Sequence, residues 1–258
     1  MFYHNKEGDG FVLVKNGDGN FIGGADLRSF LMIGQSNMAG RGEFADVEPI
    51  KNFRCYMLRN GRFLRMSEPI NPDRAVFGKG FTSGISLAAS FADEFAKHYK
   101  SRVGLIPCAD GGTSIDEWKK GGVLFDNAVF SVRLAMRSST FSGIICHHGE
   151  SDAVSDESLM EYEDKFISFV SSLRDELGAE NLPFIAGEIS ENISSEWNIG
   201  DRAVRFNKML RSLVRKIPNF AVVSSFGLKL KDDGIHFDSV SLREFGIRYF
   251  ETYKEMQK

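Results

Sequence analysis

Short apolar runs alternate with longer amphipathic segments from about residue 28 to the end of the chain. Each run is brief and mostly apolar, which is typical of strands that are buried on both faces of a sheet. The runs are Ser29–Ile33, Val103–Ile106, Ser142–Cys146, Pro183–Ile189 and Phe220–Ser224. This alternation predicts βαβ units that build a parallel sheet with helices on both of its faces.

Amphipathic segments between and after these runs predict helices. In the second of them Phe125, Val129 and Val132 recur at helical spacing on one side. The segments lie near Ser86–Tyr99, Phe125–Arg137, Leu159–Leu177, Arg202–Ile217 and Ser241–Met256. The fold class expected is therefore α/β, a three-layer α/β/α sandwich with a central, mostly parallel, five-stranded sheet.

Two further segments stand outside this alternation. Arg54–Leu58, Asn60-Gly61 and Phe63–Met66 predict a hairpin, because Asn-Gly favours the positive dihedral angles of a tight turn. We interpret this hairpin as an insertion beside the main sheet. Residues 1–27 are expected to form an N-terminal extension or small hairpin, and residues 28–258 the main domain.

Composition and charge argue against a nucleic-acid-binding or membrane protein. The 258 residues are 42% hydrophobic and 26% charged, as in ordinary soluble domains. The net charge is −3 and no basic stripe is present, so a nucleic-acid partner is not expected. No apolar run approaches the roughly 20 residues needed to cross a bilayer, and no secretory signal is visible. We expect no membrane partner and a cytoplasmic location.

The three cysteines, Cys55, Cys108 and Cys146, lack Cys-x-x-Cys spacing and are odd in number. Neither a disulfide framework nor a structural zinc site is indicated, and all three are expected in the core. No feature of the chain calls for a cofactor.

Polar clusters follow the predicted strands, at the edge where ligands bind in sheets of this kind. The clusters are Gly34–Gly40, Ala109–Ser114, His147–Asp152 and, after a loop, Asp233–His236. Four such clusters should converge on one edge of the sheet.

A serine and a histidine in these clusters could form a nucleophile and its base. Ser36 follows a strand directly, where a nucleophile could be exposed, although a serine there is also an ordinary helix N-cap. A serine hydroxyl needs an imidazole base, which in turn needs a carboxylate. His236 with Asp233 three positions earlier supplies both. Gly111-Gly112 could offer a backbone N–H to an oxyanion, or could be a plain turn.

The four clusters together resemble the SGNH hydrolase superfamily, and within it the branch of carbohydrate esterase family 6 and sialate O-acetylesterases. The resemblance runs from about Phe30 to Tyr253. Its marks are Gly34–Gly42, Gly111–Trp118, His147–Asp152 and Asp233–Phe237. It implies an SGNH or flavodoxin-like fold and a serine esterase that removes acetyl groups from sugars, of the acetylxylan or sialate type.

The resemblance also assigns roles. It implies that Ser36 is the nucleophile, His236 the base and Asp233 the orienting carboxylate, with Glu150 as a possible second carboxylate. The oxyanion hole would take the N–H groups of Ser36 and Gly112 and a side chain from the third cluster.

That third cluster departs from the family pattern. The family usually has Trp-His-Gln-Gly-Glu where this chain has Cys146-His147-His148-Gly149-Glu150. An imidazole donates an N–H only in a suitable tautomer or when protonated, unlike a glutamine amide. We hypothesise that His148 still completes the oxyanion hole. Stabilisation of the oxyanion would then be weaker, or would depend on pH.

Three other functions fit parts of the sequence. His147, His148, Glu150 and Asp152 are all metal-ligand types, but successive strand residues point to opposite faces, which disfavours a metal site. A non-catalytic or weakly active carbohydrate-binding protein on the same scaffold is the main alternative. A flavodoxin-like nucleotide site is disfavoured because neither phosphate-loop motif is present.

Substrate-binding candidates lie in or near the clusters: Gln35, Arg41, Asn71 and Trp118. Gln35, like Asn37, flanks the nucleophile and could instead bond neighbouring loops. An acetylated carbohydrate is the expected partner. The sequence leaves open which sugar is bound and whether the chain self-associates.

Overall fold

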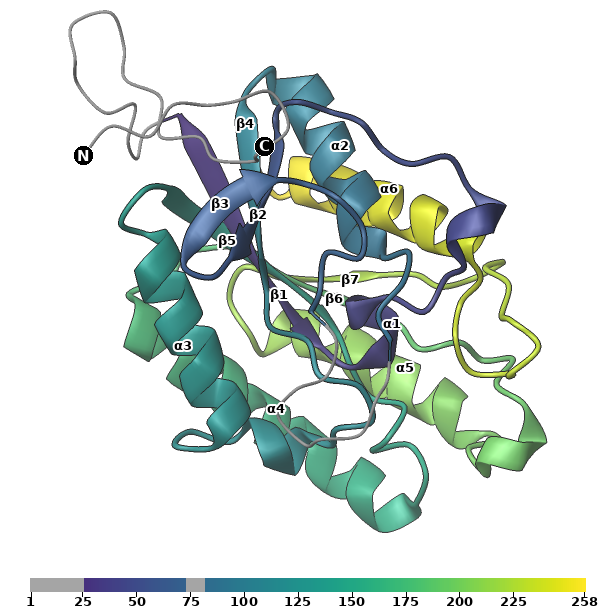
Figure 1. The fold of residues 1–258 in the computed structure, drawn as a ribbon. Coiled ribbons are helices and arrows are strands. Elements are labelled where there is room, and N and C mark those ends of the chain that lie inside the picture. Colours follow the sequence, from purple (N-terminus) through teal and green to yellow (C-terminus); the bar gives the residue numbers. More distant parts are fainter. Residues whose placement is uncertain (1–25, 73–81) are drawn as a thin grey trace, which may run out of the picture.

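A computed structural model describes residues 26–72 and 82–258. The N-terminal extension predicted for residues 1–27 therefore lies almost wholly outside the described residues, and Leu27 is the first residue of a strand. In the described ranges seven strands form one sheet, in the order β3-β2-β4-β1-β5-β6-β7 (Figure 1). They are β1 (Leu27–Gly34), β2 (Cys55–Arg59), β3 (Arg62–Arg65), β4 (Arg102–Pro107), β5 (Thr140–His147), β6 (Phe184–Gly187) and β7 (Phe220–Val223).

Helices cover both faces of this sheet, as the alternating pattern predicted (Figure 1). The α-helices are α1 (Ser36–Ala39), α2 (Leu87–Tyr99), α3 (Val123–Ala135), α4 (Asp156–Leu177), α5 (Arg202–Ser212) and α6 (Ser239–Glu255). Short 3₁₀ turns are η1 (Phe44–Asp46), η2 (Ile115–Trp118), η3 (Ser195–Trp197) and η4 (Leu213–Arg215). The three-layer α/β/α class is confirmed.

The central strand β1 divides the core into two halves. Leu31 and Ile33 pack with α3, α4 and α5, whereas Phe30 and Met32 pack with α2 and α6. All four side chains are at most 1% exposed, because successive strand residues point to opposite faces and each face is covered. The free cysteines Cys55, Cys108 and Cys146 are buried in this core, as expected.

Local sequence signals fix the helix starts. The side chains of Ser86, Ser155 and Asp238 accept hydrogen bonds from the first-turn N–H groups of α2, α4 and α6. Such caps satisfy donors that have no partner within the helix. Gly178 ends α4 in the left-handed conformation that glycine adopts most readily.

The strand count of five was too low. The predicted hairpin forms, with Asn60 and Gly61 at φ 47° and 76° in its turn. It is not an insertion beside the sheet, because β2 pairs in parallel with β4 and extends the sheet by two strands. An Asn-Gly turn predicts which two strands pair with each other, but it carries no information about the free edge of either strand.

Candidate active site

The turn that carries Ser36 is fixed to the end of the neighbouring strand. Gly34 ends β1 with φ 124°, and a Cβ added there would lie 2.0 Å from the carbonyl oxygen of His147. The backbone N–H of Gln35 donates to that same carbonyl at 3.0 Å. Only glycine permits this close approach, so the sequence here is dictated by backbone geometry. Ser36 follows as the first residue of α1 and is 7% exposed.

The second polar cluster packs directly on this turn. The N–H of Asp110 donates to the carbonyl of Gly34 at 2.9 Å. A Cβ on Gly111 would lie 3.4 Å from the Cβ of Ser36 and 2.5 Å from Arg41 Nη2. Gly112 has φ +73° and open space beside it. Gly111 therefore brings a bare backbone next to the serine, and Gly112 takes a left-handed φ that glycine adopts most readily.

His236 and Asp233 form the predicted pair within one loop. His236 Nδ1 lies 2.8 Å from Asp233 Oδ2. The other carboxylate oxygen, Oδ1, accepts from the backbone N–H groups of Ile235 and His236 at 3.1 and 3.0 Å. Partial burial raises the pKa of Asp233, but the hydrogen bonds from His236 and Ile235 outweigh it, and the net pKa lies below its ordinary value. The carboxylate is thus ionised at neutral pH.

Ser36 and His236 line the same cavity of about 210 Å³. The cavity is also lined by two glycines and four polar residues, Gly111, Gly112, Arg41, Gln35, Glu150 and Ser151. Its apolar wall consists of Val154, Trp197, Ile199 and Ile235. Within the described residues no hydrogen bond joins the Ser36 hydroxyl to the His236 ring. In an empty site such catalytic contacts are often long, so sharing one cavity is the relevant observation.

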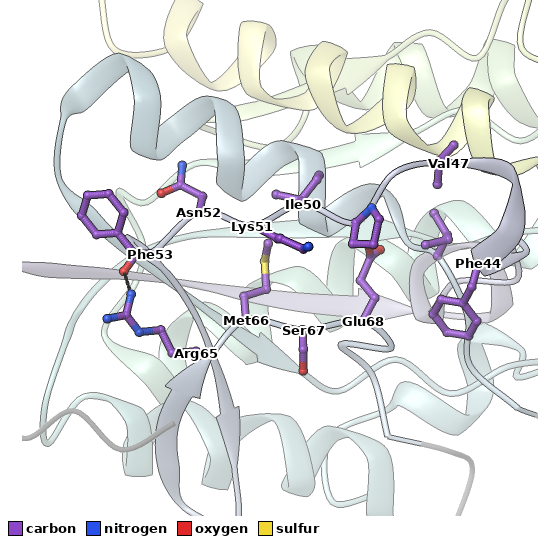
Figure 2. Close-up of a pocket in the computed structure, with 12 residues that line it drawn as sticks. Phe44, Val47, Ile50, Lys51, Asn52, Phe53, Arg65, Met66, Ser67 and Glu68 are labelled. Atoms are coloured by element: carbon purple, nitrogen blue, oxygen red, sulfur yellow. Dashed lines mark hydrogen bonds between the residues drawn. The ribbon is translucent and has the colours of Figure 1, made fainter. Parts of the chain in front are cut away.

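A second cavity, of about 480 Å³, lies between η1, residues 47–53 and residues 65–68 (Figure 2). Phe44, Ile50 and Met66 line it, together with Glu68, which is paired with Arg243. None of the residues predicted for the site lines this cavity.

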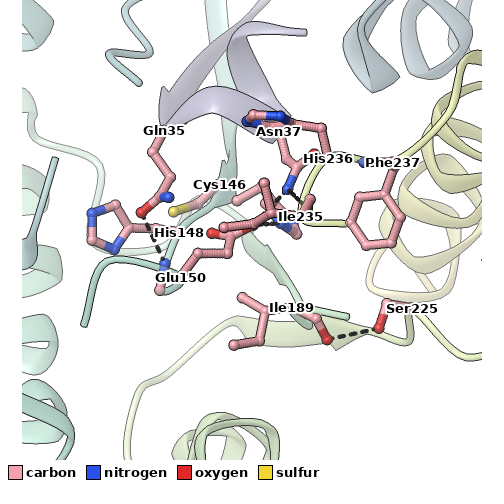
Figure 3. A network of polar contacts seen from close by, with 12 residues as sticks. Gln35, Asn37, Cys146, His148, Glu150, Ile189, Ser225, Ile235, His236 and Phe237 are labelled. Atoms are coloured by element: carbon pink, nitrogen blue, oxygen red, sulfur yellow. Dashed lines mark hydrogen bonds and ion pairs between the residues drawn. The ribbon is translucent and has the colours of Figure 1, made fainter. Parts of the chain in front are cut away.

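Glu150 belongs to a buried polar network that also contains Asn37 (Figure 3). Its Oε1 accepts from Asn37 Nδ2 at 2.6 Å and lies 3.0 Å from His147 Nε2. Burial raises the pKa of Glu150, but His147 and the hydrogen bonds outweigh that effect and lower it to about 2. Among the described residues, the carboxylate that contacts the His236 ring is that of Asp233 and not that of Glu150. The structure thus places Asp233, the first choice, on the imidazole.

His148 does not lie where the oxyanion hypothesis needs it. Its ring stacks on Tyr162 of α4, with Nδ1 3.2 Å from the tyrosine hydroxyl, and is absent from the lining of the cavity. Burial lowers its pKa to about 4, so the ring is neutral at neutral pH. The physical reason is strand alternation: His147 packs on the α6 face, against Phe245, so the next residue points to the α4 face.

The four substrate-binding candidates divide into two pairs. Gln35 and Arg41 line the cavity. Trp118 is 1% exposed and donates from Nε1 to Thr113, so it packs in the core and cannot stack on a sugar. Asn71 is buried and exchanges hydrogen bonds with both backbone groups of Ala109. We correct the prediction for Trp118 and Asn71: both support the loop that carries Gly111 and Gly112.

The prediction overlooked the wall of the cavity. Trp197, 43% exposed, lines it and donates from Nε1 to the carbonyl of Asp233 at 2.8 Å. Ile199 lies in the same segment, which follows β6. The segment follows a strand, as the predicted clusters do, but Trp197 and Ile199 carry no group that takes part in acyl transfer and so gave no chemical signal.

Neither a metal-binding cluster nor a membrane-spanning helix is found among the described residues. No group of three or more His, Cys, Asp or Glu side chains there is arranged to hold a metal ion. None of the helices in residues 26–72 and 82–258 is both long and apolar enough to span a membrane.

Known proteins resemble this chain over most of its length. A probable carbohydrate esterase of Arabidopsis thaliana is 26% identical over 240 residues, which cover 87% of this chain and 89% of the relative. The X-ray structure of an Arabidopsis thaliana protein superposes with a TM-score of 0.77 at 24% identity, covering 88% of this chain and 98% of that one. The crystal structure of NanS superposes with a TM-score of 0.71 at 14% identity, covering 91% and 98%.

The family described as "Carbohydrate esterase, sialic acid-specific acetylesterase" matches residues 26–255, nearly the whole of the described chain. The fold is shared with esterases of the SGNH and GDSL type. The chain belongs to this family of carbohydrate esterases.

Proposed function

We propose that this protein is a serine esterase that removes O-acetyl groups from carbohydrates through an acetyl-enzyme intermediate. The observation that carries the proposal is the convergence of Ser36, the His236–Asp233 pair and Gly112 on one cavity. A hydroxyl, an imidazole with its carboxylate and a bare backbone N–H are the groups that acyl transfer requires.

The reaction has two steps. His236 takes the proton of Ser36 as its oxygen attacks the acetyl carbonyl, and the N–H groups of Ser36 and Gly112 stabilise the oxyanion. The sugar alcohol leaves with the proton from His236. Water then attacks the acetyl-enzyme, again losing its proton to His236, and acetate is released with Ser36 restored. Asp233 holds the imidazole and stabilises its positive charge throughout.

The shape of the cavity favours a small acyl group. A volume of about 210 Å³ is below the usual range for drug-sized ligands. The apolar wall suits the methyl group of an acetate, while Gln35 and Arg41 offer polar contacts to a sugar. Xylan and sialic acid derivatives are both candidate substrates.

The test compares wild type and Ser36→Ala on acetylated xylan, O-acetylated sialic acids and short aryl esters. We expect Ser36→Ala to lower turnover at least about 10³-fold without unfolding the protein. Ser142→Ala is a matched control, because this serine is also 7% exposed but lies in β5. An organophosphonate should label wild type at Ser36. Equal activity of wild type and Ser36→Ala, or no labelling of Ser36, would contradict the proposal and favour a non-catalytic binding protein.

A further inference from the structure

Asn37, which the proposed chemistry does not use, forms hydrogen bonds with the backbone on both sides of His236, the proposed base. Its Nδ2 donates to the carbonyl of Ile235 at 3.3 Å, and its Oδ1 accepts from the N–H of Phe237 at 3.0 Å. These two backbone groups belong to the residues before and after His236, as Figure 3 shows. Asn37 is also the residue next to Ser36 in the chain, and it is 1% exposed.

The loop makes its other backbone contacts within itself or with different segments. The N–H of His236 is bound by Asp233, and its carbonyl accepts from Lys231. Lys231 Nζ contacts the carbonyl of Arg41, and Trp197 contacts the carbonyl of Asp233. Among the described residues, α1 is joined to this loop by the two hydrogen bonds of Asn37.

Glu150 fixes which way the Asn37 amide points. The second hydrogen of Nδ2 donates to Glu150 Oε1 at 2.6 Å, and that carboxylate is an acceptor only, since its pKa is about 2. A flipped amide would place its oxygen against a carboxylate and a carbonyl, and its NH₂ against the N–H of Phe237. All of the strong contacts therefore agree on one orientation.

We propose that Asn37 is a positioning residue that sets the approach of the His236 ring to the Ser36 hydroxyl, with Glu150 holding its amide. This inference rests on the proposed esterase function. Displacement of a reacting group by about 1 Å can cost about a hundredfold in rate, so even a small shift of the loop would be measurable.

The test is a double-mutant cycle on a reactive aryl acetate. Asn37→Ala should lower kcat about a hundredfold and change KM less than about threefold, because it moves the base and not the binding wall. In a His236→Ala background the same substitution should cost less than about threefold, because the group that it positions is already gone. Labelling of Ser36 by a phosphonate should slow by the same factor as kcat.

Two other asparagines serve as controls. Asn207 brackets Ile189 in the same way, accepting from its N–H at 3.1 Å and donating to its carbonyl at 2.9 Å. Asn207→Ala should lower Tm as much as Asn37→Ala does and leave kcat unchanged. Asn71→Ala disturbs the loop of Gly112, so its cost should persist in the His236→Ala background. Should Asn37→Ala fail to fold, Asn37→Ser takes its place in the cycle, with the same expectations.

The outcomes separate the inference from the function on which it rests. If wild type is labelled at Ser36 but Asn37→Ala keeps the wild-type kcat, the inference is overturned and the esterase function stands. An equally large cost of Asn37→Ala with and without His236 also overturns it. A wild type that neither turns over nor is labelled overturns the esterase function and this inference together.

Discussion

The turn that carries Ser36 and the loop that carries His236 meet at one cavity, but they are held in place by different means. Residues 34–40 are buried without exception, and they extend a central strand whose neighbours lie on both sides. The loop of residues 228–238 contains no helix or strand, and its Asp233 is exposed. The first segment is buried along its whole length. The second is anchored in the core at Leu228, Ile235 and Phe237, and around the exposed Asp233 it is held by hydrogen bonds.

This contrast teaches where substitutions should act. In the serine turn many contacts share the task of positioning, so loss of one should mainly lower stability. In the histidine loop each hydrogen bond is a large part of what holds the base, so loss of one should mainly lower turnover.

Replacing Asp233 by Asn should lower turnover more than any other substitution in the histidine loop that leaves His236 in place. Oδ1 accepts from two backbone N–H groups, so an asparagine must keep its oxygen there and turn its NH₂ toward His236 Nδ1. The ring would then carry its proton on Nε2, the nitrogen that has to accept the proton of Ser36. We expect Asp233→Asn to lower kcat by about 10³ to 10⁴ with little change in Tm, measured by ester turnover and thermal melting.

The neighbouring Asp232 offers a matched control, since it is exposed in the same loop. Asp232→Asn should leave kcat within about twofold of wild type, as expected for a surface substitution away from the site. If Asp233→Asn also kept most of the activity, the imidazole would need another orienting group, and Glu150 would be the first to examine.

A smaller effect is expected at Gly112, on the serine side of the comparison. Gly112 and Gly227 have φ +73° and +78°, and neither has an atom within 4 Å of an added Cβ. Alanine at either position should cost about 1 to 2 kcal/mol of unfolding free energy, from backbone strain alone. Alanine keeps its backbone N–H, so Gly112→Ala can act only by turning this proposed oxyanion donor as the strained backbone relaxes. We therefore expect kcat to fall about tenfold in Gly112→Ala and to stay unchanged in Gly227→Ala. Equal kcat in the two variants would contradict the prediction that the left-handed conformation at Gly112 is needed to aim its N–H at the oxyanion.

The fold could be predicted almost completely because its signals are local. Buried strands such as Ser29–Ile33 are apolar on both faces, and the helices carry their own periodicity and caps. The boundaries of β1 and β5 extend only one or two residues beyond the predicted runs at each end. The parallel pairing of β2 with β4 was missed because it is a contact between distant segments, and neither segment signals its partner.

The site could be predicted where chemistry requires particular residue types and spacing. The Asp233–His236 spacing indicated their contact correctly, because three positions in a loop suffice for the two side chains to meet. The orientation of His148 was predictable in principle from strand alternation. Asn37 does bond neighbouring loops, which its place beside Ser36 allowed, but its particular partners at 150, 235 and 237 could not be predicted because they become neighbours only when the sheet has formed.

Glu150→Gln should show whether Glu150 only holds the Asn37 amide or also takes part in catalysis. A glutamine oxygen can still accept from Asn37, so we expect kcat to fall less than about tenfold, far less than for Asp233→Asn. Stability should respond more clearly. The pKa of Glu150 is about 2 in the fold against 4.5 ordinarily, so its carboxylate stabilises the fold above about pH 4.5 and this contribution is lost as the pH falls toward 2.

Urea unfolding of wild type and Glu150→Gln as a function of pH would measure this contribution. The difference in midpoint should be constant above about pH 5 and narrow at lower pH. A difference that grew on acidification would mean that Glu150 is protonated in the fold. A kcat loss as large as that of Asp233→Asn would instead make Glu150 part of the proton-transfer chain.

The smallest effect should come from Trp197, which tests whether single hydrogen bonds in the histidine loop are individually important. Trp197→Phe keeps an aromatic ring in the cavity wall but removes the N–H that donates to the carbonyl of Asp233 at 2.8 Å. One such bond contributes about 1 kcal/mol, which corresponds to about a fivefold loss in kcat if all of it serves to hold the loop. Substituting an exposed aromatic of similar size elsewhere, as in Phe226→Leu, should change kcat less than twofold. Because Trp197 acts on the loop and the Ser36 turn is held by the core, its loss should slow turnover without lowering Tm by more than a few degrees. A large fall in Tm with unchanged kcat would reverse the division between the two segments.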